Sequence, residues 1–196
     1  MKNTACLFLF ALFASTLTFA GNTNIEVGAI AENAILMRNH GQTNEADAAF
    51  QQFVEAWKNI EKEERDNLRR YDKQIAIKAA ECFLVFGQSS NALAVITQVL
   101  KKTGRSLPPE SLYIYLKSTF SIGDYQATIK HFDKLKSELQ KLSIDKRQEL
   151  ALIGASAASK LGDKVRSKAF LNDAVLLAPD TLNGKNAQQE LNVLEK

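Results

Sequence analysis

Residues 112–135 read LYIYLKSTFSIGDYQATIKHFDKL, and the glycine at position 123 separates two amphipathic runs. Three further glycines, Gly41, Gly87 and Gly162, also stand between amphipathic runs. Recurring residues flank these glycines: Ala46, Ala92, Thr128 and Ser167 lie five positions after them, and Ala34, Ala80, Leu116 and Ala155 lie seven positions before. Such positions, which are small in every case but Leu116, mark where two antiparallel helices approach each other closely on both sides of a turn. The pattern therefore predicts an all-α protein of about four helix-turn-helix units.

Apolar residues follow helical spacing within these units. They recur at steps of mostly three and four residues in two stripes, which are Ala46, Ala49, Phe50, Phe53, Val54 and Trp57 in the first unit and Tyr125, Ile129, Phe132, Leu135, Leu139 and Leu142 in the third. Such stripes are typical of helices that bury one face. Residues 185–196 are polar apart from Ala187, Leu191 and Leu194, which predicts a C-terminal helix that caps the last unit.

Prolines mark two helix boundaries. Pro108 and Pro109 lie between the second and third units, where they stop one helix and Pro109 fits the first turn of the next. In the fourth unit the first helix is predicted over residues 150–161, and Pro179 is predicted to end the second helix. The four units and the capping helix thus account for most of the chain after the N-terminal segment.

A run of charged residues lies between the first and second units. Residues 58–73 are mostly charged, and they make the interval between Gly41 and Gly87 longer than the later intervals between glycines. Trp57 and Ile60 can still share one apolar face with later residues of the run. We favour a lengthened second helix with a solvated face. The alternative is a charged docking element that protrudes from the fold.

The N-terminal segment predicts export. Lys2 precedes an apolar run that is too short to span a bilayer, and Thr18-Phe19-Ala20 supplies the small residues that a signal peptidase reads. We expect residues 1–20 to be a cleavable signal peptide and residues 21–196 to be one domain in the periplasm or outside the cell. An uncleaved membrane anchor is the alternative. After residue 20 no apolar stretch is long enough to cross a membrane.

Composition excludes several classes of function. The net charge of the 196 residues is +3, whereas a nucleic-acid-binding protein normally carries a concentrated basic excess. His40 and His131 lie in different units and lack partners at metal-ligand spacing, and the glycines do not form a phosphate-binding loop. Cys82 is the only cysteine after the signal peptide, and we favour a buried inert thiol over a reactive thiol or an intermolecular disulfide. We expect no catalytic residues, no metal and no cofactor.

The repeated pattern resembles the tetratricopeptide repeat family. Phe120-Ser121-Ile122-Gly123-Asp124-Tyr125 is similar to the turn between the two helices of that family's unit, and Lys160-Leu161-Gly162-Asp163 repeats it. The second unit keeps Phe86-Gly87 and Ala92, and the fourth has Ala174 and Pro179 where the family pattern places them. The aromatic residue that the family carries early in the first helix is replaced here, and the repeats are longer than 34 residues. The resemblance implies a solenoid of helix pairs.

In the family, the first helices of the units line a concave groove that binds proteins or peptides. Carried onto this chain, the resemblance implies a partner-binding surface of Ile35, Arg38, Ile77, Lys78, Glu81, Tyr113, Lys117, Phe120, Leu152 and Lys160, with Glu32 and Ser156 beside them. The carboxylate clamp of chaperone-binding members is missing, because Ala31, Ile35, Glu110 and Ile114 occupy the corresponding positions. Tyr113 and Phe120 lie seven residues apart and can present one aromatic face. The alternative is that both rings fill the seam between units.

These observations lead to a functional hypothesis. We expect an exported, non-enzymatic scaffold that binds a protein or peptide and assists the assembly or regulation of an envelope complex. A structural subunit that self-associates into a homo-oligomer, through an exposed end of the solenoid or the segment 57–71, is the alternative. An accessory domain of an envelope hydrolase is disfavoured by the scarcity of reactive side chains.

Overall fold

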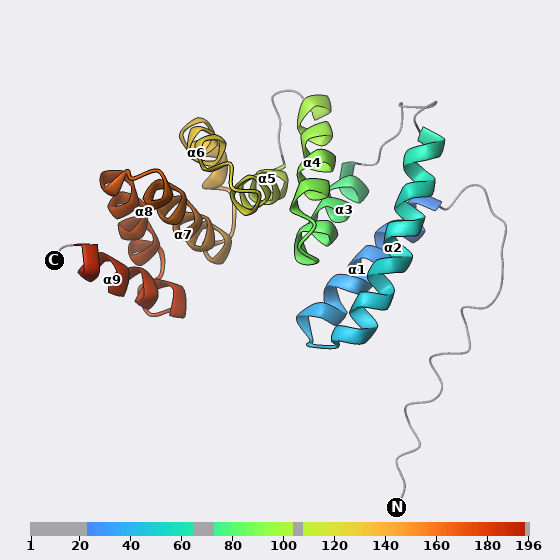
Figure 1. The fold of residues 1–196 in the computed structure, drawn as a ribbon, viewed down its shortest axis with the longest axis horizontal. Helices are drawn as coiled ribbons and strands as arrows, with labels where there is room; N and C mark the ends of the chain where they lie inside the picture. The colour runs from blue at the N-terminus through green and yellow to red at the C-terminus, as the bar shows by residue number, and fades with distance from the viewer. Residues whose placement is uncertain (1–22, 65–72, 104–107, 195–196) are drawn as a thin grey trace, which may run out of the picture.

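The computed structural model describes residues 23–64, 73–103 and 108–194 (Figure 1). The predicted signal peptide, residues 1–20, lies outside these ranges, as do residues 65–72 of the charged run. Every regular element in the described ranges is a helix, which confirms the all-α part of the predicted fold class. The helices are α1 Thr23–Asn39, α2 Thr43–Glu64, α3 Lys73–Val85, α4 Ser89–Thr103, α5 Pro109–Ser121, α6 Tyr125–Leu139, α7 Ile144–Lys160, α8 Lys164–Leu177 and α9 Leu182–Leu194.

The helices pack in adjacent pairs along the chain (Figure 1). α1 packs on α2, α3 on α4, α5 on α6 and α7 on α8. The first helix of each pair also contacts the first helix of the next, so that α1 contacts α3, α3 contacts α5 and α5 contacts α7. The last helix, α9, packs on α8 and α7. The predicted terminal helix is therefore present, and it covers the last pair.

The four repeated glycines form the turns within the pairs. Gly41, Gly87, Gly123 and Gly162 have φ values of 75°, 73°, 83° and 76°. A side chain is strained in this left-handed region, and glycine is not. After two of these turns an aspartate caps the next helix: Asp124 accepts a hydrogen bond from the backbone N–H of Ala127, and Asp163 accepts one from that of Arg166.

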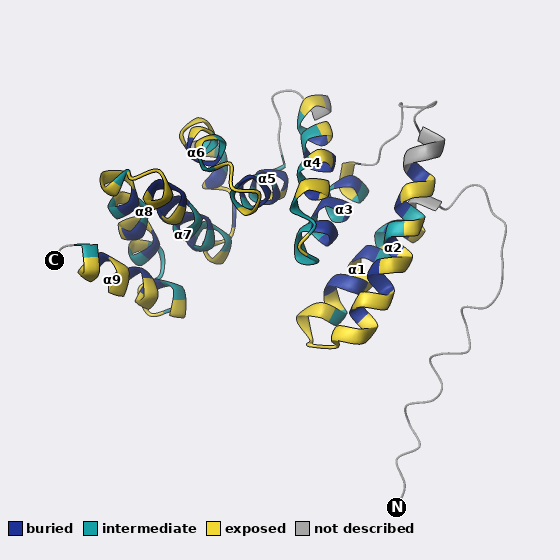
Figure 2. Ribbon diagram, in the orientation of Figure 1, coloured by how far each residue is buried: buried dark blue, intermediate teal, exposed yellow. Residues whose placement is uncertain are grey.

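The residues at fixed distances from the glycines lie where paired helices approach each other. All eight are at most 3% exposed: Ala34, Ala46, Ala80, Ala92, Leu116, Thr128, Ala155 and Ser167. Figure 2 shows the resulting buried faces turned toward neighbouring helices, with exposed residues on the outside. The buried side chains form one large cluster across α1 to α4, which also includes Ile114 of α5, and smaller clusters across α5 to α9. The core is thus extended along the row of helices.

Helix ends agree with the sequence prediction at α2 and differ from it at α6 and α7. α2 continues through Glu64, and Trp57 and Ile60 are buried, which is consistent with a lengthened second helix. α6 ends at Leu139, yet Leu142 is still buried in the turn that follows. α7 begins at Ile144, six residues earlier than predicted, because the Ser143 side chain caps it by accepting a hydrogen bond from the Lys146 backbone N–H.

A buried glutamine joins α7 to the connection between α8 and α9. Gln148 Nε2 donates to the carbonyl oxygens of Ala174 and Ala178, both at 2.8 Å, and its Oε1 accepts from the Thr181 hydroxyl at 2.8 Å. The Thr181 oxygen also accepts from the backbone N–H of Gly184 at the start of α9. One side chain therefore satisfies carbonyls at the end of α8 and orients the start of α9.

None of the helices in the described ranges is both long enough and apolar enough to cross a membrane.

Candidate functional site

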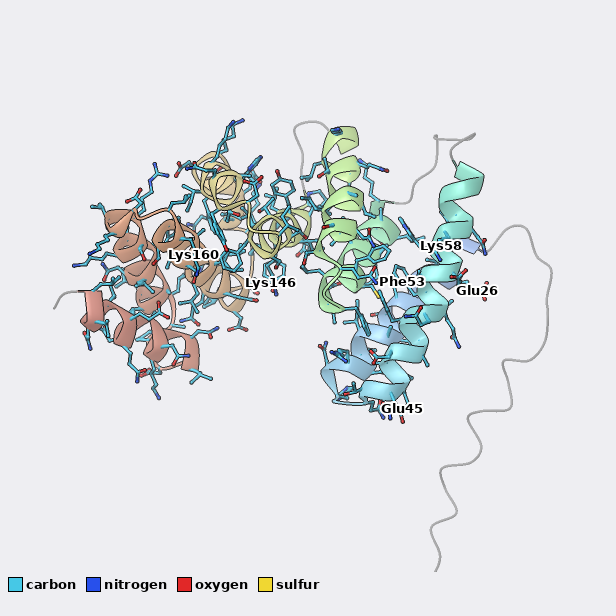
Figure 3. All side chains as sticks on the ribbon, in the orientation of Figure 1. Glu26, Glu45, Phe53, Lys58, Lys146 and Lys160 are labelled. Carbon is cyan, nitrogen blue, oxygen red and sulfur yellow. The ribbon has the colours of Figure 1, made fainter. Side chains whose placement is uncertain are left out.

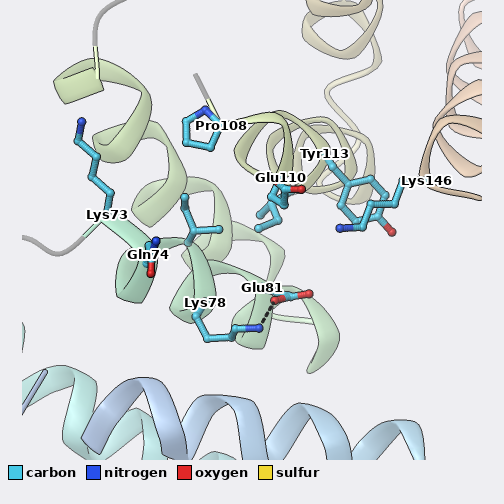
Figure 4. A pocket seen from close by; sticks show the side chains of 10 residues that line it. Lys73, Gln74, Lys78, Glu81, Pro108, Glu110, Tyr113 and Lys146 are labelled. Carbon is cyan, nitrogen blue, oxygen red and sulfur yellow. Dashed lines mark hydrogen bonds and ion pairs between the residues drawn. The ribbon is translucent and has the colours of Figure 1, made fainter. Parts of the chain in front are cut away.

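A groove of about 940 Å³ crosses three consecutive first helices of the pairs (Figure 4). It lies against α3, α5 and α7, and we name it the α3–α5–α7 groove. Its lining residues are Lys73, Gln74, Ile77, Lys78, Glu81, Pro108, Glu110, Tyr113, Ile114 and Lys146. The volume lies within the range of about 300–1,000 Å³ that is typical of ligand sites.

Apolar side chains line part of the groove. Ile114 is buried in the core shared with α1 to α4, and Ile77 and Tyr113 pack against the same core while remaining partly exposed. Pro108 precedes the first turn of α5 and adds a rigid apolar ring. Because their inner sides are packed, these residues form a firm surface on which an apolar side chain of a ligand can be buried.

Charged groups of both signs surround this apolar surface. Lys78 Nζ lies 3.1 Å from Glu81 Oε2, one turn further along α3 (Figure 4). Lys73 and Glu110 lie on α3 and α5 and are exposed. Lys146 Nζ of α7 lies over the Tyr113 ring, 5.2 Å from its centroid. Charges on three helices can therefore fix the orientation of a ligand that binds across the groove.

The aromatic residue at the groove, Tyr113, belongs to a hydrogen-bonded cluster that joins α5 to α7. Its hydroxyl donates to Glu149 Oε2 at 2.5 Å, and Lys117 Nζ donates to Glu149 Oε1 at 2.7 Å and to the Tyr113 hydroxyl at 3.1 Å. Burial and the hydrogen bond to Glu149 raise the pKa of Tyr113 to about 12. Burial by itself would lower the pKa of Lys117. The hydrogen bonds to Glu149 and Tyr113 outweigh this effect of burial, and the pKa of Lys117 is therefore raised.

Four of the residues implied by the resemblance meet at this groove, and a fifth adjoins it. Ile77, Lys78, Glu81 and Tyr113 line the groove, and Lys117 contacts Tyr113. The residues that sequence reasoning missed are Lys73, Gln74, Pro108, Glu110, Ile114 and Lys146. Lys146 lies outside the helix predicted over residues 150–161. Ser143, which caps α7, is the signal in the sequence that could have placed the start of this helix before Lys146.

The other implied residues lie elsewhere. Ile35 is buried in the core between α1 and its neighbours and has no free surface for a partner, which corrects the expected position. Arg38 lies 3.5 Å from Asp47 of α2 and over the Phe86 ring. Leu152 packs against the cluster of α7 to α9, and the exposed Glu32 lies on α1. The structure does not bring these residues to the groove.

Phe120 and Tyr113 have different neighbours although both lie on α5. Phe120 packs against a buried cluster that contains Ile129 and Ala157, and its ring centroid lies 5.6 Å from that of Tyr125. Two helical turns separate Phe120 from Tyr113 along the axis, about 10 Å. Phe120 therefore fills the seam between helix pairs, whereas Tyr113 reaches the groove.

Ser156 and Lys160 line a separate hollow of about 340 Å³ beside α8 and α9. Figure 3 labels Lys160 and Lys146 at separate places on the ribbon; they lie toward opposite ends of α7. Fourteen residues of helix separate them by about 20 Å. A ligand in the α3–α5–α7 groove would therefore need to be extended to reach Lys160.

Two side chains outside the groove, Cys82 and His131, are buried or hydrogen-bonded to neighbouring groups. Cys82 is fully buried, and burial, with a contribution from Glu81, raises the pKa of its thiol to about 12. His131 Nδ1 donates to the Ala127 carbonyl at 2.7 Å, and its Nε2 lies 3.3 Å from the Tyr115 hydroxyl. Among the described residues, no cluster of three His, Cys, Asp or Glu side chains has the geometry to hold a metal ion.

Comparisons with protein-family models, with curated proteins and with solved structures find no match to this chain. The function proposed for it therefore rests on its own residues and geometry.

Proposed function

We propose that the chain is an exported, non-enzymatic interaction scaffold of tetratricopeptide-like repeats, and that it binds a peptide segment of a partner protein in the α3–α5–α7 groove. The observation that carries the proposal is the groove, in which Ile77, Tyr113 and Ile114 are surrounded by charges on three helices. Peptide recognition of this kind gains affinity from apolar anchors and specificity from charge. The partner would be a component of an envelope complex.

The order of helix contacts supports a solenoid. The first helices of the pairs contact one another in sequence, from α1 through α3 and α5 to α7, and α9 covers the end. Repeat proteins build long binding surfaces in this way, because each unit contacts only its neighbours. The groove spans three such units, which suits an extended segment of chain.

The N-terminal sequence supports export. Lys2, the apolar run and Thr18-Phe19-Ala20 before Gly21 are the features of a cleavable signal peptide. N-terminal sequencing of the protein purified from its native host should give a mature product that starts at Gly21. A product that retains Met1 would contradict export by this route.

A photo-crosslinking experiment tests the binding site. A photoreactive amino acid replaces Glu110, which is exposed and lines the groove, or Lys134, which is exposed on α6 outside it. We expect one discrete crosslinked partner with the probe at position 110 and none with the probe at position 134. Equal crosslinking at both positions, or none at either, would contradict the proposed site.

Two substitutions then separate binding from folding. Tyr113→Ala should weaken the affinity for the crosslinked partner by about tenfold or more, as truncation of an interface anchor does. Phe120→Ala should lower the free energy of unfolding by about 2–4 kcal/mol, because it empties part of the seam, and should leave the affinity of the folded protein unchanged. The reverse assignment would place the binding surface at Phe120.

Self-association is a second candidate function, and exposed apolar side chains favour it. Leu182 and Val193 of α9 are 74% and 72% exposed at the C-terminal end of the row of helices. Exposed apolar side chains at an end of a repeat array can pair with a second copy. The mass measured by light scattering should then rise with concentration, and Val193→Glu should abolish the rise.

A further inference from the structure

A second pocket, separate from the α3–α5–α7 groove, lies between α6, α7 and α8. It encloses about 460 Å³, and we name it the α6–α7–α8 pocket. Leu150 of α7 lines it and is fully buried, and Phe132 of α6 and Phe170 of α8 line it with their ring centroids 5.0 Å apart. The pocket therefore has an apolar wall between the second helices of two neighbouring pairs, and charged and polar residues complete its lining.

Two charged residues that line this pocket, Arg147 and Asp173, form no ion pair with another described residue, and the buried one of their polar atoms is on Arg147. Arg147 Nη1 donates to the neutral amide oxygen of Gln140 at 2.6 Å, and its Nε is buried without a hydrogen-bond partner among the described residues. No carboxylate of the described chain pairs with Arg147. By contrast, Arg166, which also lines the pocket, pairs with Asp133 at 3.2 Å and with Asp163 at 3.4 Å.

The unpaired donor of Arg147 indicates what kind of group would complete the site. A buried donor without an acceptor is rare in native proteins, and it costs free energy that an acceptor would recover. The Nε–H and one Nη2–H lie on the same edge of a guanidinium, opposite to the bond that Nη1 makes here. Because Nε is buried, the Arg147 side chain has to shift toward the pocket before a ligand can reach this edge. A carboxylate matches this edge with two parallel hydrogen bonds.

We propose that the α6–α7–α8 pocket binds a single-chain amphiphile with one carboxylate, whose apolar chain lies against Phe132, Leu150 and Phe170 and whose carboxylate meets Arg147. The apolar lining supplies most of the affinity, since burial of each methylene of the chain is favourable. Asp133 and Asp173 at the pocket disfavour ligands with several negative charges, such as nucleotides. A medium-chain fatty acid has the required chemistry.

The experiment measures by calorimetry how the full chain binds decanoate. Decanol, which has the same chain length and no charge, is the matched probe. Three variants are compared with the wild type. Arg147→Met removes the guanidinium and keeps the length of the side chain. Ala169→Phe obstructs the pocket from an exposed position, and Ala94→Phe places the same ring at an exposed position on α4, outside the pocket.

We expect the wild type to bind decanoate more tightly than decanol. We also expect Arg147→Met and Ala169→Phe each to weaken decanoate binding by about tenfold or more. Ala94→Phe should bind decanoate like the wild type. If Arg147→Met does not fold, the preference for decanoate and the loss in Ala169→Phe decide the question.

Four results would overturn the proposal. The first is that decanoate does not bind below the concentration at which it self-associates, and the second is that decanoate and decanol bind with equal affinity. The third is that folded Arg147→Met or Ala169→Phe binds decanoate as tightly as the wild type. The fourth is that Ala94→Phe loses as much decanoate affinity as Ala169→Phe does. Amide shifts mapped by NMR should be confined to α6, α7 and α8. The groove and the pocket share no lining residue, so either proposal can fail without the other.

Discussion

Lys117 Nζ on α5 lies 2.7 Å from Glu149 Oε1 on α7, and the same carboxylate accepts the Tyr113 hydroxyl through its other oxygen. The three side chains join the first helices of two successive pairs next to the α3–α5–α7 groove. They are partly exposed, so their net contribution to stability is modest, about 1 kcal/mol or less for an ion pair of this kind. Their position makes them more important for the geometry of the groove than for folding.

Stability should fall in alkaline solution because of this cluster. The pKa of Tyr113 is raised to about 12 from 10.0, and the pKa of Lys117 is also raised. Both groups keep their protons in the folded state at a pH where the unfolded state loses them, so their contribution is complete below about pH 10 and is lost as pH rises toward about 12.

Glu149→Gln tests this dependence, because it removes the charge and keeps the size of the side chain. The free energy of unfolding in urea should fall more steeply above about pH 10 in the wild type than in the variant. The absorbance of tyrosinate should also show that Tyr113, identified by subtraction of Tyr113→Phe, ionises at lower pH in the variant. An unchanged titration of Tyr113 would refute the assigned role of Glu149.

Cys82 should not react while the protein is folded. Its thiol is fully buried and its pKa is raised to about 12, so a negligible fraction is thiolate at neutral pH. An aromatic disulfide reagent should modify it at a rate that follows unfolding and rises with urea. Rapid, complete modification in buffer alone would show that α3 opens locally.

Glycine substitutions should have opposite effects at two helical positions. A Cβ on Gly184 would lie 2.2 Å from the Ala178 carbonyl oxygen, whereas a Cβ on Gly28 would meet only Ile75 Cγ1, at 3.6 Å. Gly184→Ala should lower the free energy of unfolding by about 2 kcal/mol or more, since backbone has to move. Gly28→Ala should raise it by about 0.5–1 kcal/mol through helix propensity. Urea unfolding of both variants gives the comparison, and equal effects would contradict the packing described for α9.

Gln148 should be critical for the attachment of α9. Gln148→Leu keeps the approximate size of the side chain but leaves the carbonyl of Ala174 without its side-chain donor, whereas the carbonyl of Ala178 keeps its bonds from Thr181. The expected cost is about 1–3 kcal/mol, because the unpaired Ala174 carbonyl stays buried. Amide hydrogen exchange should become faster in α9 before it does in α3. Gln188→Leu, on the exposed side of α9, is the matched control.

The sequence alone determined the helix pairs and their close contacts. The positive φ at Gly123 and the burial of Thr128 and Leu116 depend on residues that are near one another in the chain. Each unit therefore carries the same local signal in its sequence. The signal is a glycine in the connection between the two helices, followed five residues later by a small side chain. The predicted capping helix follows from local pattern in the same way.

Only the tertiary structure decided which side chains share a site. Tyr113 and Phe120 occupy one helix at a spacing that suggested one aromatic face, yet Phe120 packs in a seam and Tyr113 meets Lys146 and Glu149 of another pair. The neighbours of each side chain depend on how α5 and α7 cross, and that crossing results from packing along the whole row of helices. Arg147 likewise has no local signal that separates it from Arg166, because the absence of a counter-charge is a property of the surrounding helices. Local preferences decide where helices begin and turn, and contacts between distant residues decide what their surfaces can bind.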